Sequence, residues 1–184
     1  DGYLMRRRPF FMGKPICHGT IATTWHLRFF RAGCGRCEGR LYDQHFLCDG
    51  RYGKLRGQLL DLQLASIESW TSSHNRWSTA EAHQALLEDE GRDLLPARFF
   101  GDPRMRRRWI KKHVWYRAPL FIRPLLFFLY RYIFKLGFLD GRHGIVYHVL
   151  QTFWYRFLVD AKLLEREQAK QWKSDLVRSL EEGF

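Results

Sequence analysis

Residues 41–46, with the sequence LYDQHF, place an acidic, an amide and an imidazole side chain next to one another. A carboxylate such as Asp43, flanked by Gln44 and His45 at the end of a strand, suits a general base that is hydrogen-bonded into a polar cleft. Glu38 lies just before this segment. The alternative is structural: Asp43 and Gln44 cap a turn, and His45 is a half-buried residue whose hydrogen bonds are satisfied.

The four cysteines offer a second kind of chemistry. Cys34 and Cys37 have two residues between them, and His45 and Cys48 repeat that spacing. Thiolates on a tight turn can converge on one metal, so these four side chains could close a tetrahedral zinc site. Against this, His45 and Cys48 fall in an expected strand, where residues three apart point to opposite faces. The competing interpretation is a hairpin tip with two free thiols.

The side chains named above must be positioned by the secondary structure around them. Short apolar runs separated by glycines predict strands over residues 3–7, 24–31, 41–47 and 58–62. At Ser66 the pattern becomes helical. Apolar and aromatic residues then recur at helical spacing, and the helix is expected to end near Gly91. Strands followed by helices predict an α+β fold.

The chain carries 31 Lys and Arg against 19 Asp and Glu, a formal net charge of +12. Residues 104–135 hold ten of these basic side chains and no acidic one, and they are also rich in aromatic residues. Such a mixture is typical of a nucleic-acid groove or of a helix at an anionic membrane surface. Core helices of an ordinary basic protein are the third interpretation.

The pattern within residues 124–138 favours the membrane surface, and no nucleic-acid partner is expected. Pro124 suits a first helical turn, and Arg131 and Lys135 would lie together on one side of the helix. The opposite broad face would hold Leu125, Leu126, Leu129, Tyr132, Ile133 and Leu136. Charges interrupt any apolar run near the ~20 residues that span a bilayer. The residues expected at lipid headgroups are Trp109, Trp115, Arg123, Arg131 and Lys135.

The remaining sequence predicts a turn at residues 139–144, an apolar helix over 145–164 and a charged helical end after Glu165.

A hydrophobic content of 46% allows a hydrophobic core, and 16% aromatic residues exclude wholesale disorder. Four cysteines in 184 residues are too sparse for a disulfide-stapled mini-protein. Because the first residue is Asp1 and not Met, we expect the sequence to be a portion of a longer product.

Four segments taken in order carry a family resemblance: RRRPFFMGKPI, YDQHF followed by DG, HNRWS and KLGFLDGRHG. From Gly2 to about Glu165 the chain resembles the C-terminal half of bacterial family 2 glycosyltransferases that build lipopolysaccharide core, capsule and exopolysaccharide. The resemblance implies a GT-A type fold and an inverting enzyme that moves a sugar from a nucleotide-sugar donor to a lipid-linked or polysaccharide acceptor. It also implies a peripheral location at the cytoplasmic face of the bacterial inner membrane.

The resemblance implies roles for single residues as well. Asp43 would be the general base, with Glu38, Gln44 and His45 lining the acceptor pocket. Arg76 and Trp77 resemble a pair near the acceptor site of processive relatives, although the preceding residues Ser-His-Asn differ from that pattern.

The donor half of the family has no counterpart in these residues, because the chain contains neither an Asp-x-Asp motif nor a Gly-rich phosphate loop. Mg²⁺ or Mn²⁺ is therefore expected only through the missing half, and the chain alone is expected to be inactive. The expected parts are an acceptor-side β-rich part (1–64), a helical part (65–103) and a membrane-docking segment (104–184). The rival hypothesis is a non-enzymatic module that is organised by zinc or that binds membrane or nucleic acid.

Overall fold

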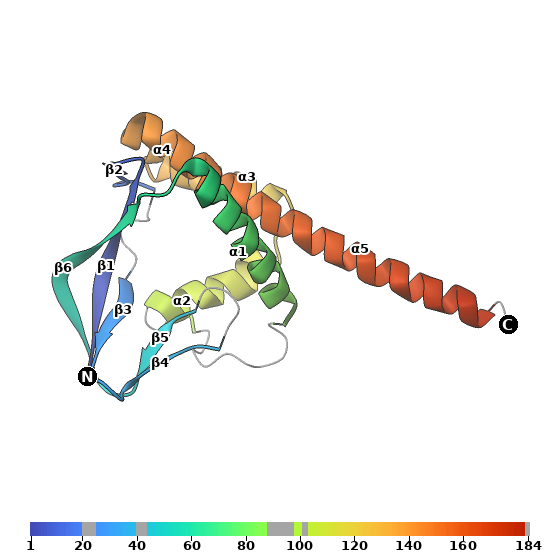
Figure 1. The fold of residues 1–184 in the computed structure, drawn as a ribbon, viewed down its shortest axis with the longest axis horizontal. Coiled ribbons are helices and arrows are strands. Elements are labelled where there is room, and N and C mark those ends of the chain that lie inside the picture. The colour runs from blue at the N-terminus through green and yellow to red at the C-terminus, as the bar shows by residue number, and fades with distance from the viewer. Residues whose placement is uncertain (20–24, 40–43, 88–97, 101–102, 183–184) are drawn as a thin grey trace.

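The computed structural model describes residues 1–19, 25–39, 44–87, 98–100 and 103–182, with the main sheet at one end of the molecule and the helices beside it (Figure 1). The strands are β1 (Gly2–Phe11), β2 (Lys14–Pro15), β3 (Trp25–Phe30), β4 (Gly35–Cys37), β5 (Phe46–Cys48) and β6 (Tyr52–Gln63). The helices are α1 (Ile67–Leu87), α2 (Pro103–Ile110), α3 (Ile122–Leu129), α4 (Gly141–His148) and α5 (Tyr155–Glu182). π-helical turns η3 (Lys111–Trp115), η4 (Tyr130–Phe134) and η6 (Val149–Trp154) follow α2, α3 and α4, and η5 (Gly137–Asp140) is a 3-10 turn. The predicted α+β class is confirmed.

Strand β1 is the centre of the main sheet. β6 pairs with it in parallel, while β2 and β3 pair antiparallel along its other edge. Met12 and Gly13 form the two-residue turn between β1 and β2, with φ angles of 50° and 77°. Positive φ at both positions gives the turn a twist that matches the strands it joins. The predicted strands at 3–7 and 58–62 lie within β1 and β6, and the strand predicted at 24–31 is β3, described from Trp25 onward.

A separate hairpin pairs β4 with β5, with Arg36 opposite Leu47. The strand predicted over 41–47 is confirmed at Phe46 and Leu47, which lie in β5, and is wrong at Gln44 and His45, which are not in a strand. Residues 40–43, which include Asp43, lie outside the described residues.

Helix α1 begins where the sequence predicts. The hydroxyl of Ser66 accepts a hydrogen bond from the backbone N–H of Ser69 at 3.2 Å, which caps the first turn. Trp70 and Ala82 are buried along its inner face. The predicted end near Gly91 lies outside the described residues.

The helix predicted over 124–138 is α3 with η4, and Pro124 lies in its first turn as expected. It ends at Phe134, because Leu136 adopts a left-handed conformation with φ 59° and leads into η5. The predicted turn at 139–144 is wrong from Gly141 onward, where α4 begins. A Cβ on Gly144 would lie 2.9 Å from the carbonyl oxygen of Gly137, so this glycine serves close packing instead of a turn.

Helices α4, η6 and α5 follow one another without a break, and the outer half of α5 projects away from the body of the molecule (Figure 1). This agrees with the predicted apolar helix over 145–164 and the charged helical end after it. None of the described helices combines the length and hydropathy needed to cross a bilayer.

The hydrophobic core crosses the three parts expected from the sequence. One cluster joins Phe11 and Ile16 to Trp70 and Tyr147. A second joins Ala82 of α1 to residues of α5, namely Tyr155, Val159 and Leu163. The ranges 1–64, 65–103 and 104–184 therefore share a core.

Candidate functional site

Glu38, directly after β4, is the centre of a buried polar cluster. Its Oε1 accepts a hydrogen bond from Nη1 of Arg108 at 2.8 Å, and its Oε2 accepts one from Nη2 at 2.8 Å. The two side chains are only 1% and 8% exposed. A buried bidentate pair of this kind is strong and directional, and it links the β4–β5 hairpin to α2.

His45 closes the cluster from the other end of the loop. Its backbone N–H donates to Oε2 of Glu38 at 3.1 Å, and its ring Nδ1 lies 3.3 Å from the same oxygen. The backbone N–H of Glu38 in turn donates to the carbonyl oxygen of His45 at 3.1 Å. The chain on both sides of residues 40–43 is therefore fixed in place, and those residues include the predicted base Asp43.

The charge state of Glu38 follows from these partners. Burial by itself would raise the pKa of the Glu38 carboxyl, but hydrogen bonds from His45 and Arg108 and the positive charge of Arg108 outweigh it. The pKa is held well below its ordinary value, so Glu38 stays ionised. Glu38 is only 2% exposed, and its two carboxylate oxygens are bonded to Arg108 and His45. We assign it a positioning role.

Gln44 is exposed on the same loop, and its Oε1 lies 3.7 Å from Sγ of the exposed Cys37. Cys48 is buried against Leu4 and Leu27, and the half-buried Cys34 packs against the same cluster. These two thiols and the exposed Cys37 therefore occupy different environments. Nδ1 of His45 already faces Glu38. Within the described part of the chain, no group of three or more His, Cys, Asp or Glu side chains is arranged to hold a metal ion.

Arg76 and Trp77 lie on α1 and contact residues of their own helix. The guanidinium of Arg76 donates to the hydroxyls of Ser72 and Ser73, and the ring of Trp77 meets the edge of His74 at 4.6 Å. These contacts do not join them to the Glu38 cluster.

Two of the residues expected at lipid headgroups are turned inward, which corrects that prediction. Arg123 is 3% exposed and binds both carboxylate oxygens of Asp160 at 2.5–3.0 Å. Arg131 is 9% exposed, and its Nε donates to the carbonyl oxygen of Gly19 at 2.6 Å. The idea that Arg131 shares an outward side with Lys135 is therefore also wrong.

The other three predicted headgroup residues differ in exposure. Trp115 is half-buried, with its ring 5.4 Å from that of Phe127. Trp109 is also half-buried and stacks on His113 at 4.7 Å. Lys135 is exposed, with its ammonium 5.5 Å from the ring of Tyr130.

The partners of the basic segment were not anticipated. Glu81 receives hydrogen bonds from Arg156 and Tyr155 at 2.7 and 2.8 Å, and its Oε1 lies 2.9 Å from Nζ of Lys111. Burial would raise the pKa of Glu81, but the charges of Arg156 and Lys111 lower it to about 2. The signal for such partners is present in the sequence as single carboxylates inside apolar helical runs, such as Asp160 in FLVDAKLL.

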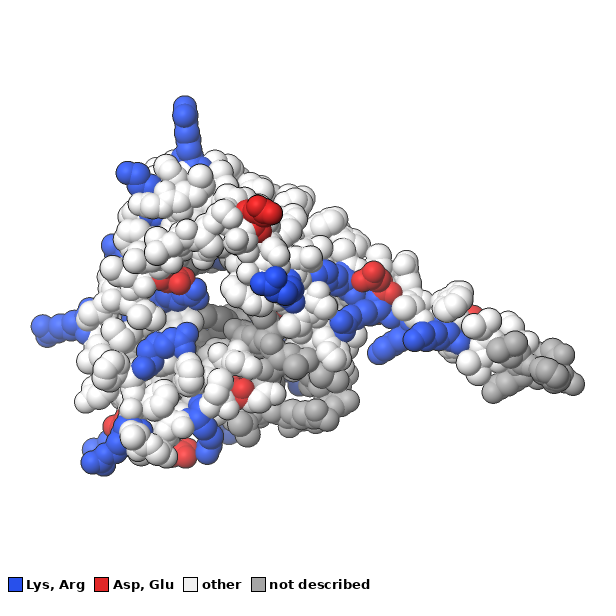
Figure 2. Space-filling view, viewed as in Figure 1, with Lys and Arg blue, Asp and Glu red and all other residues white. Residues whose placement is uncertain are grey.

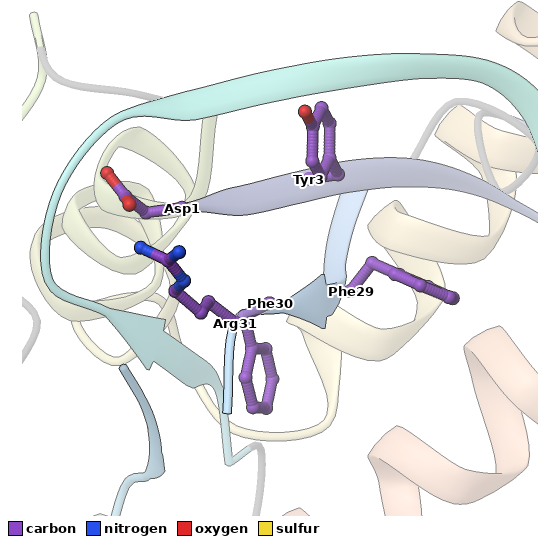
Figure 3. A pocket seen from close by; sticks show the side chains of 5 residues that line it. All are labelled: Asp1, Tyr3, Phe29, Phe30 and Arg31. Carbon is purple, nitrogen blue, oxygen red and sulfur yellow. The ribbon is translucent and has the colours of Figure 1, made fainter. Parts of the chain in front are cut away.

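A shallow cavity of about 330 Å³ lies elsewhere, at the N-terminal end of β1 (Figure 3). Asp1 and Arg31 lie next to each other on one side of it, and the rings of Phe29 and Phe30 point away from one another. Since Tyr3 and Phe29 are 45% and 65% exposed, the cavity is an open surface depression, and it shares no lining residue with the Glu38 cluster.

The positive charge of the molecule is widely spread. Figure 2 shows Lys and Arg side chains from the sheet to the projecting α5, where acidic side chains lie among them. Comparison of the chain with protein-family models, with curated proteins and with solved structures found no match.

Proposed function

We propose that the chain is the acceptor-side and membrane-docking part of an inverting family 2 glycosyltransferase with a GT-A type fold. The donor is a nucleotide sugar, and the acceptor is a lipid-linked or surface-polysaccharide precursor. The enzyme is peripheral, at the cytoplasmic face of the bacterial inner membrane. The residue motifs that resemble this family are the basis of the proposal.

The observation that supports it best is the fixed position of Glu38 and His45, which lie on either side of residues 40–43. Arg108 binds Glu38, and Glu38 accepts a hydrogen bond from the backbone N–H of His45, so the two described residues that flank the segment of Asp43 are held together. A general base needs a fixed frame of this kind, because catalysis depends on holding the base within hydrogen-bond reach of one hydroxyl. Asp43 is the one carboxylate within that segment.

In the proposed reaction the acceptor hydroxyl oxygen attacks the anomeric carbon of the donor sugar. Asp43 takes the hydroxyl proton, and the bond from the anomeric carbon to the phosphate oxygen breaks as the nucleoside diphosphate leaves with the electron pair. Gln44 and His45 would orient the acceptor. Glu38 and Arg108 would keep His45 in place without touching the substrate.

Mg²⁺ or Mn²⁺ would neutralise the leaving diphosphate in an enzyme of this kind. The described residues do not fit such an ion, because Glu38 is already neutralised by Arg108 and no cluster of suitable ligands is present among them. The ion would be held by the donor half, and no step above depends on it.

Asp43→Asn, made in a protein that joins this chain to a donor half, tests the proposal. Transfer is expected to fall by a factor on the order of 10²–10⁴, the usual contribution of a general base, while donor binding stays intact. Asp49→Asn is the matched control, because Asp49 is an exposed carboxylate after the same hairpin and pairs only with the exposed Arg36 at 3.2 Å in the described contacts. Unchanged turnover in Asp43→Asn would remove this residue from the mechanism.

A membrane-surface module without enzymatic activity is the second candidate. It is favoured by the outward-facing apolar side chains of α3 and η4, which serve docking whether or not transfer occurs. Donor binding and transfer by the joined protein would distinguish the transferase from such a module.

A further inference from the structure

In α3 and η4 the arginine side chains are buried and many apolar side chains are exposed. In a water-soluble helix the charged side chains face solvent and the apolar ones face the core. Here Arg123 and Arg131 are buried and bonded within the protein. The side chains on the outward face are apolar instead.

We call this face the outer stripe and define it as Ile122, Leu125, Leu126, Tyr130, Ile133 and Phe134. These residues are spaced three or four apart around α3 and η4, or adjacent, so they form one continuous band. Their exposed fractions run from 46% for Leu125 and Tyr130 to 75% for Phe134. Beyond the helix, Leu136, Phe138 and Leu139 continue the exposed apolar surface at 45–55%.

The contacts of the two buried arginines fix the orientation of the helix. Each guanidinium loses its hydration on burial and needs a fixed partner in return. Arg123 has Asp160 of α5, and Arg131 has the carbonyl oxygen of Gly19. The fold therefore holds the charged side of the helix inward, although water alone would favour the opposite orientation.

The charges around the outer stripe indicate what covers it. No Asp or Glu occurs between residues 103 and 139, while Lys135 lies at the end of the stripe and Arg142 follows at the start of α4, both exposed. Tyr130 lies beside the ammonium of Lys135 at 5.5 Å. An exposed apolar band with an aromatic ring and cations at its end suits the boundary between acyl chains and phosphate headgroups.

We infer that the outer stripe is the surface by which the chain lies on an anionic lipid bilayer, with Lys135 and Arg142 at the headgroups and Leu126, Ile133 and Phe134 in the acyl boundary. This inference deepens the proposed function by naming the docking surface. It keeps Leu125, Leu126 and Ile133 of the predicted apolar face and removes Arg123 and Arg131 from the contact with lipid.

Vesicle flotation of the 184-residue chain tests it, using phosphatidylcholine alone and phosphatidylcholine with about 30% phosphatidylglycerol. The unchanged chain is expected to float with the anionic vesicles. The triple variant Leu126→Ser, Ile133→Ser and Phe134→Ser is expected to lose binding by at least about tenfold. Lys135→Gln with Arg142→Gln is expected to weaken binding to anionic vesicles only.

The matched control removes three exposed apolar side chains elsewhere, through Leu60→Ser, Leu62→Ser and Leu176→Ser, which are 54%, 53% and 46% exposed. It is expected to bind like the unchanged chain. Equal binding by the stripe variant, or no flotation of the unchanged chain, would overturn the inference. So would a dimer of the unchanged chain that becomes monomeric in the stripe variant without any vesicle binding, because a second copy would then cover the stripe. The assay contains neither donor nor acceptor, so its failure leaves the Asp43 test of transfer unaffected.

Discussion

At the scale of single residues, arginine and lysine side chains of the basic segment form ion pairs with carboxylates that are distant in the sequence. Glu38 binds Arg108, Asp160 binds Arg123, and Glu81 lies at the contact of α1 and α5. These pairs are buried, so each partner depends on the other to offset the cost of losing water. Removing one member leaves an uncompensated charge in the interior.

Glu38→Gln is therefore expected to lower the free energy of unfolding by about 3–5 kcal/mol, because Arg108 would remain buried without a counter-charge. Urea denaturation measures this change. Asp49→Asn is the control, since Asp49 and Arg36 are 75% and 57% exposed and their pair should contribute less than about 1 kcal/mol. Similar effects of the two substitutions would contradict the structural role of Glu38.

His148 predicts how stability depends on pH. It is fully buried, and neither ring nitrogen has a hydrogen-bond partner in the described structure. Burial, with the nearby charge of Arg131, lowers the pKa of His148 to about 4, although Asp140 acts in the opposite direction. Between pH 6.5 and 4 the unfolded chain binds this proton and the folded chain does not, so stability falls as the pH falls, by about 3 kcal/mol in total.

His148→Gln is expected to reduce this pH dependence, which urea denaturation at pH 7 and pH 5 would measure. His74 contributes with the same sign, because burial lowers its pKa too, so part of the slope should remain. The carboxyls of Glu38 and Glu81 act at lower pH: their lowered pKa values stabilise the fold above about pH 4.5, and this contribution is lost on further acidification. An unchanged slope in the variant would exclude His148 as its source.

At the scale of elements, the orientation of α3 is set by its contact with α5. Asp160 accepts hydrogen bonds from Arg123 and from the backbone N–H of Phe121, the residue that precedes α3 with φ 67°. One carboxylate thus fixes both the start of the helix and the side that faces inward. Gly137 allows the chain after η4 to pass close to His148, where a Cβ would lie 2.6 Å from Nε2.

Asp160→Leu is expected to destabilise the fold by about 3–5 kcal/mol, because it leaves Arg123 buried without its partner. Adding Arg123→Met should recover much of that loss, since replacing both members of a buried pair by apolar groups is often close to neutral. Thermal and urea denaturation of the single and double variants measure the coupling. Additive losses would show that the pair does not hold α3 in place.

At the scale of the whole molecule, the core joins the sheet to α1, α4 and the first half of α5, and the rest of α5 stands apart. Val159 and Leu163 are buried, whereas Trp172 and Leu176 are 65% and 46% exposed. The outer half of α5 therefore adds length and charge to the molecule without adding to its core (Figure 1).

Removing residues 167–184 is accordingly expected to change the free energy of unfolding by less than about 1 kcal/mol, because the deletion takes away no buried side chain among the described residues. Far-UV circular dichroism should show the loss of helix, and urea denaturation should give a nearly unchanged midpoint. A large drop in the midpoint would mean that the outer helix contacts the body of the molecule.

The sequence alone determined β1, β3, β6, α1 and α3 with η4, because hydrophobic periodicity and capping act over a few residues: Ser66 starts α1, and Pro124 falls in the first turn of α3. It did not predict β2, β4 or α2. The role of a glycine could not be read from the sequence, since Gly144 could mark a turn or a close contact. The carbonyl oxygen of Gly137, which lies where a Cβ on Gly144 would clash, shows that it is a close contact. The tertiary structure decided which residues meet. Glu38 and Arg108 are 70 positions apart and Arg123 and Asp160 are 37 apart. Whether an arginine faces water or the interior depends on such a distant partner, and local periodicity carries no information about it.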